Sequence, residues 1–254
     1  MTLEDDEVVH VEGAVAPCDV LFVCEHASNY FPESFGDLGL SDEVRESHVA
    51  WDPGALALTR LLAERFDSSL VAGGVSRLLY DCNRPPVAES AIPQRSEIFD
   101  IPGNVGLSDA AREARVEQIY LPFRGAVEQV IAMLEPKAIV TVHSFTPIYH
   151  GAKRDVEIGI LHDRDTRLAD GMLEALAGAP HDVQRNAPYG PEDGVTHSLK
   201  LYGLATQTAN VMLEVRNDLL RTETQIAHMA DVIEGALQAA LAGLAKDTKT
   251  EEGR

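Results

Sequence analysis

Two histidines lie where a buried segment meets a loop, a position from which they could ligate a metal ion. His26 follows the apolar run DVLFVCE at 19–25, and His143 ends the run KAIVTVH at 137–143. Imidazole nitrogen is a preferred ligand of divalent metals, zinc above all. Either histidine could instead hydrogen-bond a loop carbonyl, but the position that they share favours a common metal site. The sequence has no H-E-x-x-H helix of the thermolysin type.

The third metal ligand is open. Glu25 adjoins His26, but neighbours in a strand point to opposite faces. Asn29 lies three residues beyond His26, and an amide is a poor ligand for zinc. Asp52 precedes a proline in the segment WDPGA, so it is either a ligand or the N-cap of the next helix. His26 and His143 are therefore candidate ligands, and for Asp52 both metal ligation and N-capping remain open.

An amide and a guanidinium stand side by side at Asn83-Arg84, in the segment SRLLYDCNRPP at 76–86. Arginine binds a carboxylate through two parallel hydrogen bonds, which lysine cannot match. In a chain of net charge −20, a fixed arginine at a strand end is a natural anchor for an acidic substrate. The alternative is a structural ion pair between Arg84 and Asp81.

Glu214 is a carboxylate inside the apolar run ANVMLEV at 209–215. Burial raises the pKa of such a group toward the range that a general base needs at neutral pH. Arg216 lies two residues further on the same strand face, so a buried ion pair is the alternative. We predict Glu214 as the catalytic base. Further candidates for contact with substrate are Ser76, Arg77, Ser144 and Arg216.

Two loops rich in glycine and proline, IYHGAKRD and NAPYGPEDGVTH, could wall a pocket. A surface or turn role is the simpler expectation for each polar residue in and near them. These residues are Arg154, His162, Asn186, Tyr189, Thr196 and His197. The sequence has no G-x-S-x-G motif, phosphate-binding glycine loop or G-x-G-x-x-G motif, so serine-hydrolase and nucleotide-binding functions have no motif support.

The elements that must position these residues alternate between strands and helices. Strands are expected at 19–25, 69–74, 76–81, 137–143, 156–161 and 209–215, and helices at 53–66, 108–134, 166–178, 195–203 and 217–243. This alternation predicts an α/β fold, a three-layer α/β/α arrangement around a mostly parallel mixed sheet. Ligands of open α/β sheets bind beyond the carboxyl ends of the strands, which is where the polar clusters fall.

The composition predicts one domain over 1–254, with a core at about 18–240, an acidic lead-in over 1–16 and a polar tail after Ala245. The chain has 21 Lys and Arg residues against 41 Asp and Glu. This balance disfavours nucleic acid and membrane partners but allows a small anionic substrate at a locally positive site. The three cysteines, and a sequence without signal peptide or membrane-length apolar run, predict a cytoplasmic protein without disulfides. The oligomeric state is open.

Five segments, in this order and spacing, resemble the N-formylglutamate amidohydrolase family. They are CEHASNYFP, HVAWDPGA, SRLLYDCNRPP, VHSFTP and EVRNDL. The resemblance covers roughly residues 18–240 and implies a fold similar to that of zinc carboxypeptidases and aspartoacylases. The His-x-x-Glu ligand pair of those enzymes is replaced here by His26-Ala-Ser-Asn29.

The resemblance implies zinc ligation by His26 and His143, and Asp52 belongs to the family pattern. It also implies a carboxylate clamp at Asn83-Arg84 and Glu214 as the base. We therefore predict a zinc-dependent hydrolase of the N-acyl (formyl) amide of a small acidic amino acid. One alternative is a deacylase or carboxypeptidase-like hydrolase of another acylated or peptide substrate. The other is a metal-free protein that binds acidic amino acids.

Overall fold

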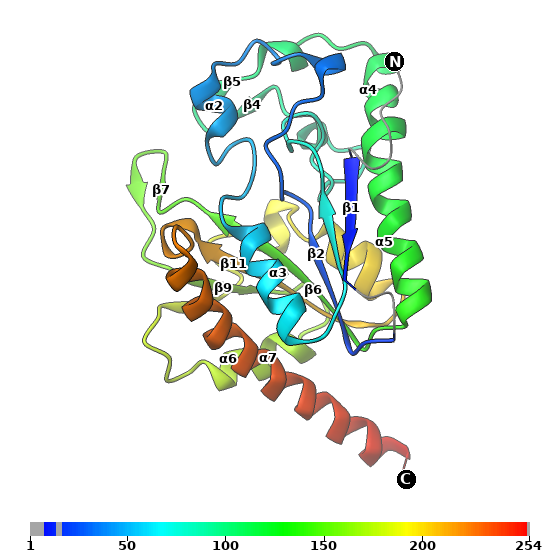
Figure 1. Cartoon of the computed structure of the whole chain (residues 1–254), viewed down its shortest axis with the longest axis vertical. Helices are drawn as coiled ribbons and strands as arrows, with labels where there is room; N and C mark the ends of the chain where they lie inside the picture. The colour runs from blue at the N-terminus through cyan, green and yellow to red at the C-terminus, as the bar shows by residue number, and fades with distance from the viewer. Residues whose placement is uncertain (1–7, 14–16, 253–254) are drawn as a thin grey trace.

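The computed structural model describes residues 8–13 and 17–252, with side chains as far as Ala245. A mixed sheet lies at its centre, with the strand order β1-β3-β2-β6-β11-β9-β10 (Figure 1). These strands are β1 (Val9–Glu12), β2 (Val20–Cys24), β3 (Leu70–Gly73), β6 (Ala138–Phe145), β9 (Ile158–Leu161), β10 (Val183–Arg185) and β11 (Ala209–Arg216). Strands β3, β2, β6 and β11 run parallel, whereas β1 and the pair β9–β10 run the other way. The predicted α/β fold with a mostly parallel mixed sheet is confirmed.

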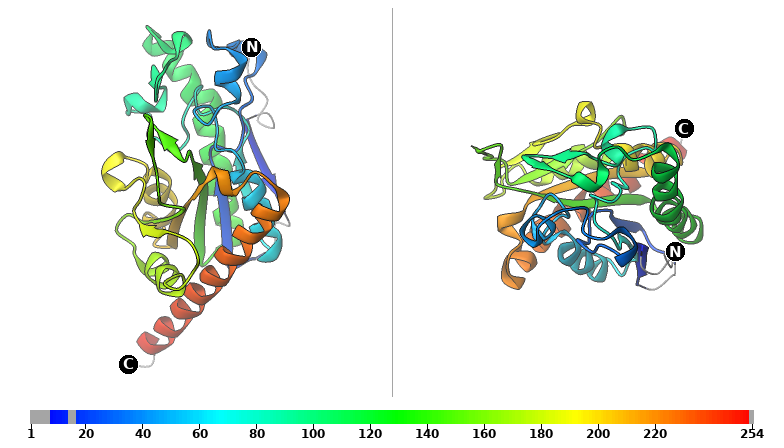
Figure 2. Two further views of the ribbon diagram at one scale, coloured as in Figure 1. Left: turned by 90° about the vertical axis from the view of Figure 1, so that its left-hand side faces the viewer. Right: turned by 90° about the horizontal axis from the view of Figure 1, so that it is seen from above.

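Helices cover both faces of the sheet because alternate strand residues are apolar on each face. Phe22 packs on one face with α3 (Ala55–Arg65), α6 (Arg167–Ala175) and α7 (Glu223–Glu252). Its neighbours Leu21 and Val23 pack on the other face with α5 (Leu121–Leu134), which continues α4 (Asp109–Arg115) through the π-helical turn Val116–Tyr120. In the left view of Figure 2, α3 and α7 lie to the right of the strands. The three-layer arrangement is therefore confirmed.

The remaining elements are short. They are α2 (Asp42–Glu46), the π-helical turn Leu199–Leu204, and the 3-10 turns Glu33–Phe35, Glu89–Ala91, Pro102–Asn104, Pro191–Asp193 and Asn217–Leu219. Two small hairpins, absent from the sequence-based expectation, are β4 (Arg95–Ser96) with β5 (Phe99–Asp100), and β7 (Ile148–Tyr149) with β8 (Ala152–Lys153). The side chain of Glu97, between β4 and β5, connects the two hairpins, because its Oε1 accepts a hydrogen bond from the His150 backbone N–H at 2.9 Å. Its Oε2 lies 2.8 Å from His48 Nε2.

The segment 76–81 is not the strand that its apolar run predicts. It forms successive turns, and at its end the Asp81 N–H donates to the Ala91 carbonyl at 2.8 Å. Leu78 and Leu79 are buried in the apolar layer under α5. A short apolar run indicates burial, and burial alone does not distinguish a strand from an irregular buried segment.

The two ends of the chain also differ from the prediction. Part of the predicted lead-in over 1–16 is strand β1, which pairs antiparallel with β3, while residues 1–7 and 14–16 lie outside the described residues. Helix α7 continues past Ala245, where a polar tail was expected. The cysteines are free, as predicted: Cys18, Cys24 and Cys82. None of the helices in the described part of the chain is long and apolar enough to cross a membrane.

Gly73, the last residue of β3, has no side chain, so the backbone at Glu25, just after β2, can pass close to it. A Cβ on residue 73 would lie 2.2 Å from the Glu25 carbonyl oxygen. We expect Gly73→Ala to lower the free energy of unfolding by about 1–3 kcal/mol, because the backbone at Glu25 must move. Gly125→Ala is the matched control, since a Cβ there meets nothing within 4 Å. Equal urea midpoints for the two variants would show that this close approach is unimportant.

Candidate active site

The carboxyl ends of three neighbouring strands bring His26, His143 and Glu214 together. His26 lies two residues beyond the end of β2, which pairs with β6. His143 belongs to β6, and its register partner on β11 is Glu214. All three residues are buried. The carboxyl edge of the parallel strands therefore forms the site, as the sequence predicts.

Asp52 reaches the two histidines from a tight turn before α3. Its N–H donates to the His26 carbonyl at 2.9 Å, which holds the turn against the end of β2. Gly54 adopts a φ of +83° at the N-cap of α3, where a Cβ would lie 2.5 Å from Leu220 Cβ. The alternative prediction of Asp52 as the helix N-cap is wrong, because Gly54 is the cap residue and no side chain caps α3.

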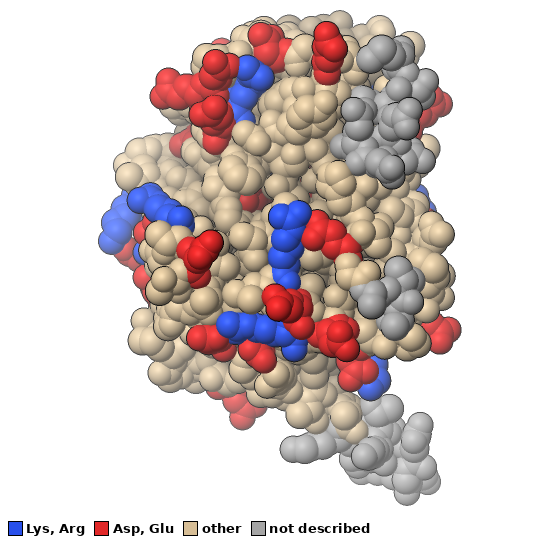
Figure 3. Space-filling view, viewed as in Figure 1, with Lys and Arg blue, Asp and Glu red and all other residues tan. Residues whose placement is uncertain are grey.

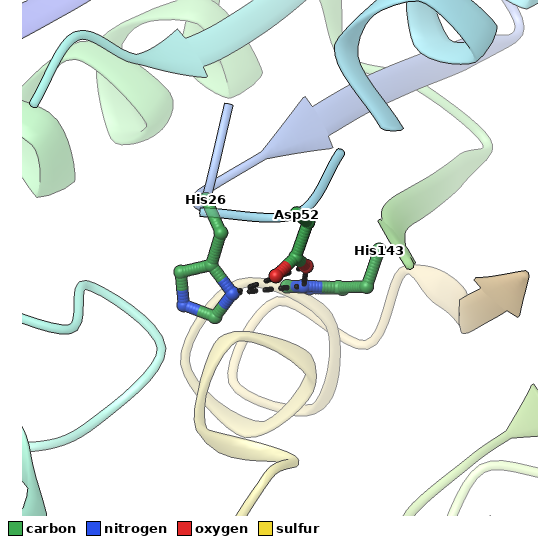
Figure 4. A group of neighbouring side chains, drawn as sticks. All are labelled: His26, Asp52 and His143. Carbon is green, nitrogen blue, oxygen red and sulfur yellow. Dashed lines mark hydrogen bonds and ion pairs between the residues drawn. The ribbon is translucent and has the colours of Figure 1, made fainter. Parts of the chain in front are cut away.

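Figure 4 shows His26, Asp52 and His143 pointing toward one another from separate segments. Asp52 Oδ2 lies 2.9 Å from His143 Nδ1 and 3.3 Å from His26 Nδ1. The two Nδ1 atoms are 3.2 Å apart. One ligand atom from each residue lies within 4.8 Å of the others, so the group could hold a metal ion.

The far edge of each imidazole faces a carboxylate. His26 Nε2 lies 2.7 Å from Asp81 Oδ1, and His143 Nε2 lies 3.1 Å from Glu25 Oε2. A carboxylate at Nε2 favours the tautomer that carries its proton there, which leaves the lone pair on Nδ1. The two Nδ1 atoms and the Asp52 carboxylate then face one another. This donor set of nitrogen and oxygen fits a divalent cation such as zinc.

Glu25 and Asp81 are the orienting groups that sequence reasoning missed. Strand alternation suggested that Glu25 points away from the site, but Glu25 and His26 follow the last residue of β2, so alternation no longer applies. Their side chains reach different edges of the His143 ring. Asp81 was placed among the polar groups at strand ends and considered as a partner of Arg84, but not as a partner of His26. Glu25 could have been recognised from its charge at the end of the buried apolar run DVLFVCE.

Arg77 bridges the two aspartates of the site. Its Nη1 lies 3.3 Å from Asp52 Oδ1, and its Nη2 lies 2.6 Å from Asp81 Oδ2. Burial works to raise the pKa of Asp52, but the imidazoles of His26 and His143, with Arg77, outweigh it and hold this pKa below its ordinary value. Arg77 lines the cavity, where a substrate contact was predicted, yet its guanidinium forms ion pairs with two of the protein's own carboxylates.

Glu214 is suited to exchange a proton near neutral pH. The side chain is buried, and its Oε2 has no hydrogen-bond partner among the described residues. Burial raises the pKa of Glu214 to about 7. Arg216 does not pair with it, so that alternative is wrong: the Arg216 guanidinium binds Asp218 and Glu157. Arg216 is therefore occupied away from the cavity, and the structure does not support it as a substrate contact.

Asn83 and Arg84 both line the cavity, but the Asn83 side chain is held by hydrogen bonds to a neighbouring loop and the Arg84 side chain is not. The Asn83 amide donates to the Val195 carbonyl at 2.6 Å and accepts from the Ser198 N–H at 3.0 Å, so it also holds that loop. Among the described residues, the Arg84 guanidinium donates a hydrogen bond to the Asn83 carbonyl alone, at 2.9 Å. The alternative pairing of Arg84 with Asp81 is not formed. Arg84 is thus available to an acidic ligand.

The two predicted serines have different surroundings. Ser144 lines the cavity; its N–H donates to Asp52 Oδ2 at 3.3 Å, and its Oγ donates to the Pro53 carbonyl at 2.8 Å. Ser76 is fully buried and donates to the Ala50 carbonyl at 2.8 Å. Ser76 therefore fixes the turn beneath the site and does not line the cavity, which corrects the prediction for this residue.

The cavity above these groups has a volume of about 490 Å³. His26, Asp52, His143 and Glu214 line it, together with loop residues that include His48 and Glu97. Of the loop residues for which a surface role was expected, Arg154 and Tyr189 line the cavity. The other four are not among its lining residues: His162, Asn186, Thr196 and His197.

The protein has a three-layer α/β fold with a polar cavity at the carboxyl ends of its parallel strands. More narrowly, the chain belongs to the N-formylglutamate amidohydrolase family, whose model matches residues 18–221. A search of the curated proteins finds no match.

Several solved structures are similar to this chain. Gene product Atu2144 from Agrobacterium tumefaciens is 51% identical, with a TM-score of 0.91, and the match covers 95% of this chain and 97% of that one. N-formylglutamate amidohydrolase from Ralstonia eutropha JMP134 is 17% identical, with a TM-score of 0.64 and coverage of 94% and 99%. The second likeness shows a common fold.

Proposed function

We propose that this protein is a zinc-dependent hydrolase of the N-acyl amide of a small acidic amino acid, with N-formylglutamate as the leading substrate. One observation carries the proposal: the donor atoms of His26, Asp52 and His143 converge on the floor of a cavity that Glu214 also lines. The named activity of the Ralstonia eutropha relative supports the choice of N-formylglutamate.

The residues of the site have separate roles in the proposed reaction. His26, Asp52 and His143 would hold the cation, which supplies Lewis acidity that polarises an amide carbonyl and favours attack by water. Glu214, with its pKa raised to about 7, takes the proton of the attacking water and returns one to the leaving amine. Arg84 holds the substrate carboxylate and so fixes the scissile bond beside Glu214.

The size of the cavity favours a small substrate over a peptide. A volume of about 490 Å³ is in the lower half of the range of small-molecule sites, about 300–1,000 Å³. The loop contact between Glu97 and His150 connects two hairpins beside this cavity. A small acylated amino acid therefore fits better than an extended chain.

Arg84→Lys is expected to raise KM for N-formyl-L-glutamate by about 10-fold or more, with a smaller effect on kcat. The reason is that lysine keeps the charge but loses the two parallel hydrogen bonds to a carboxylate. Steady-state kinetics measures both constants. Arg124→Lys is the matched control, because Arg124 is exposed and pairs with Glu128 on α5. An unchanged KM for the Arg84 variant would remove the clamp from this account.

A substrate panel tests the proposed function. Purified protein is assayed for release of the free amino acid from N-formyl-L-glutamate, N-acetyl-L-glutamate, N-formyl-L-methionine and a glutamyl dipeptide. We expect the N-acylated glutamates to be cleaved faster than the other two, and chelation to abolish the activity. Preference for the dipeptide would favour a carboxypeptidase-like enzyme, and binding of glutamate without turnover of any substrate would favour a binding protein.

A further inference from the structure

Arg154 lies in a cage of aromatic rings on the wall of the cavity. The centroid of the Tyr149 ring lies 4.3 Å from its guanidinium carbon, that of Tyr189 4.8 Å, and that of Phe145 5.6 Å. Rings at these distances attract a cation and hold it in place. Its Nη2 donates to the Tyr189 hydroxyl at 2.9 Å, while the Thr146 carbonyl is 3.5 Å from Nη1. The guanidinium is therefore fixed, yet several of its five donors have no described acceptor.

Most arginines of this acidic chain have a carboxylate partner, and Arg154 does not. Figure 3 shows blue side chains lying against red ones over α2, α3 and α7. The ion pairs there include Arg45–Asp42, Arg60–Glu12 and Arg65–Asp231. Among the described residues, neither Arg154 nor Arg84 forms an ion pair, although the net charge is −20 and both line the same cavity.

A half-buried guanidinium without a counter-ion has lost part of its hydration and regained no anion in exchange. Tyr189 cannot serve as that anion, because burial and the nearby Glu214 carboxylate raise its pKa to about 12 and keep the phenol neutral. The phenol oxygen instead orients the guanidinium. Two fixed, unpaired guanidiniums in one cavity match a ligand that carries two carboxylates.

We propose that Arg154 binds the side-chain carboxylate of the substrate and makes the cavity selective for amino acids with two carboxylates. This inference rests on the proposed function, in which Arg84 takes the α-carboxylate. Arg154 acts by direct contact, while Tyr149 and Tyr189 position it. The competing explanation is that Arg154 only holds the β7–β8 hairpin against the Tyr189 loop.

Three probes separate the two carboxylates: N-formyl-L-glutamate, its γ-amide N-formyl-L-glutamine, and its α-amide N-formyl-L-isoglutamine. We expect Arg154→Gln to lower kcat/KM by about 10- to 100-fold, chiefly through KM, for the glutamate and isoglutamine substrates. N-formyl-L-glutamine lacks the γ-carboxylate, so its kcat/KM should barely change. Arg84→Gln should show the reciprocal pattern and spare isoglutamine. An equal loss on all three substrates for Arg154→Gln would overturn the inference in favour of a structural role.

A binding measurement separates this inference from the proposed function. Titration calorimetry with L-glutamate and with L-glutamine needs no turnover. It compares the wild type with Arg154→Gln, or with Arg154→Lys if Arg154→Gln does not fold. We expect the wild-type protein to prefer L-glutamate and either Arg154 variant to lose much of that preference. If the preference depends on Arg154 but no acylated substrate is cleaved, the hydrolase proposal fails and this inference stands. A preference unchanged in the variants, or no binding of L-glutamate to the wild type, would overturn it.

Discussion

Glu214→Gln is expected to lower kcat by about 100- to 10,000-fold while the metal content stays at the wild-type level. Glutamine has nearly the same shape as glutamate but cannot take a proton. The buried Glu214 carboxyl has an Oε2 without a partner among the described residues, so the substitution breaks no hydrogen bond to that atom. The fold and the metal-binding group should therefore be preserved. Stopped or steady-state assays of formate release measure the loss.

The pH profile of kcat adds a second check on Glu214. Because burial raises its pKa to about 7, the basic form is lost as the pH falls through neutrality, so the wild-type kcat should decline on the acid side. The residual activity of the Gln variant should lack this decline. Glu128→Gln on the surface of α5 is the control and should behave as wild type. Turnover retained in Glu214→Gln would assign the base to another residue.

His143→Ala is the second change with a large expected effect, because it removes one of the three converging donors. We expect metal affinity to fall by more than about 100-fold, since loss of an outer partner of a ligand alone costs about 10- to 100-fold. The variant also leaves Glu25, which is buried, without its imidazole neighbour. Some loss of stability should therefore accompany the loss of metal. Elemental analysis of the purified variant gives the metal content.

The controls for His143→Ala distinguish ligand loss from unfolding. His10→Ala, on the exposed face of β1, should keep both metal and activity. Circular dichroism should give the wild-type spectrum for the His143 variant, because the substitution changes one side chain of β6 and leaves its backbone pairing in place. A folded His143 variant with a full complement of metal would exclude this residue from the ligand set.

Strands β2 and β6 and the positions of His26 and His143 could be predicted because each rests on a local pattern. The runs that end near His26 and His143 are apolar on both faces, as strands between two helix layers must be. The rule that ligands bind at the carboxyl ends of parallel strands then places both histidines at one edge of the sheet. Asp52 remained ambiguous, because an aspartate before proline is an ordinary helix start. Only the three-dimensional position of Gly54 as the cap residue resolves it.

The partners of those residues could not be predicted, because they come from irregular segments. Asp81 follows a series of turns whose apolar run imitates a strand, and its distance to His26 depends on how those turns pack. Arg154 directly follows a hairpin of two-residue strands, which are too short to leave a periodic pattern. Phe145 and Tyr149 are near it in the sequence, but Tyr189 is 35 residues away, so the complete cage exists only in the folded chain. The predicted pairing of Arg216 with Glu214 was wrong, because two residues on the same face of a strand need not pair with each other. Arg216 pairs with Glu157 and Asp218 instead.

The measurement that tests the central claim most directly is the metal content of the purified wild-type protein, with formate release from N-formyl-L-glutamate assayed on the same sample. We expect about one zinc per chain, loss of activity on chelation and recovery on adding zinc. Protein without metal that neither binds zinc nor gains activity from it would show that the chain is not a zinc-dependent hydrolase.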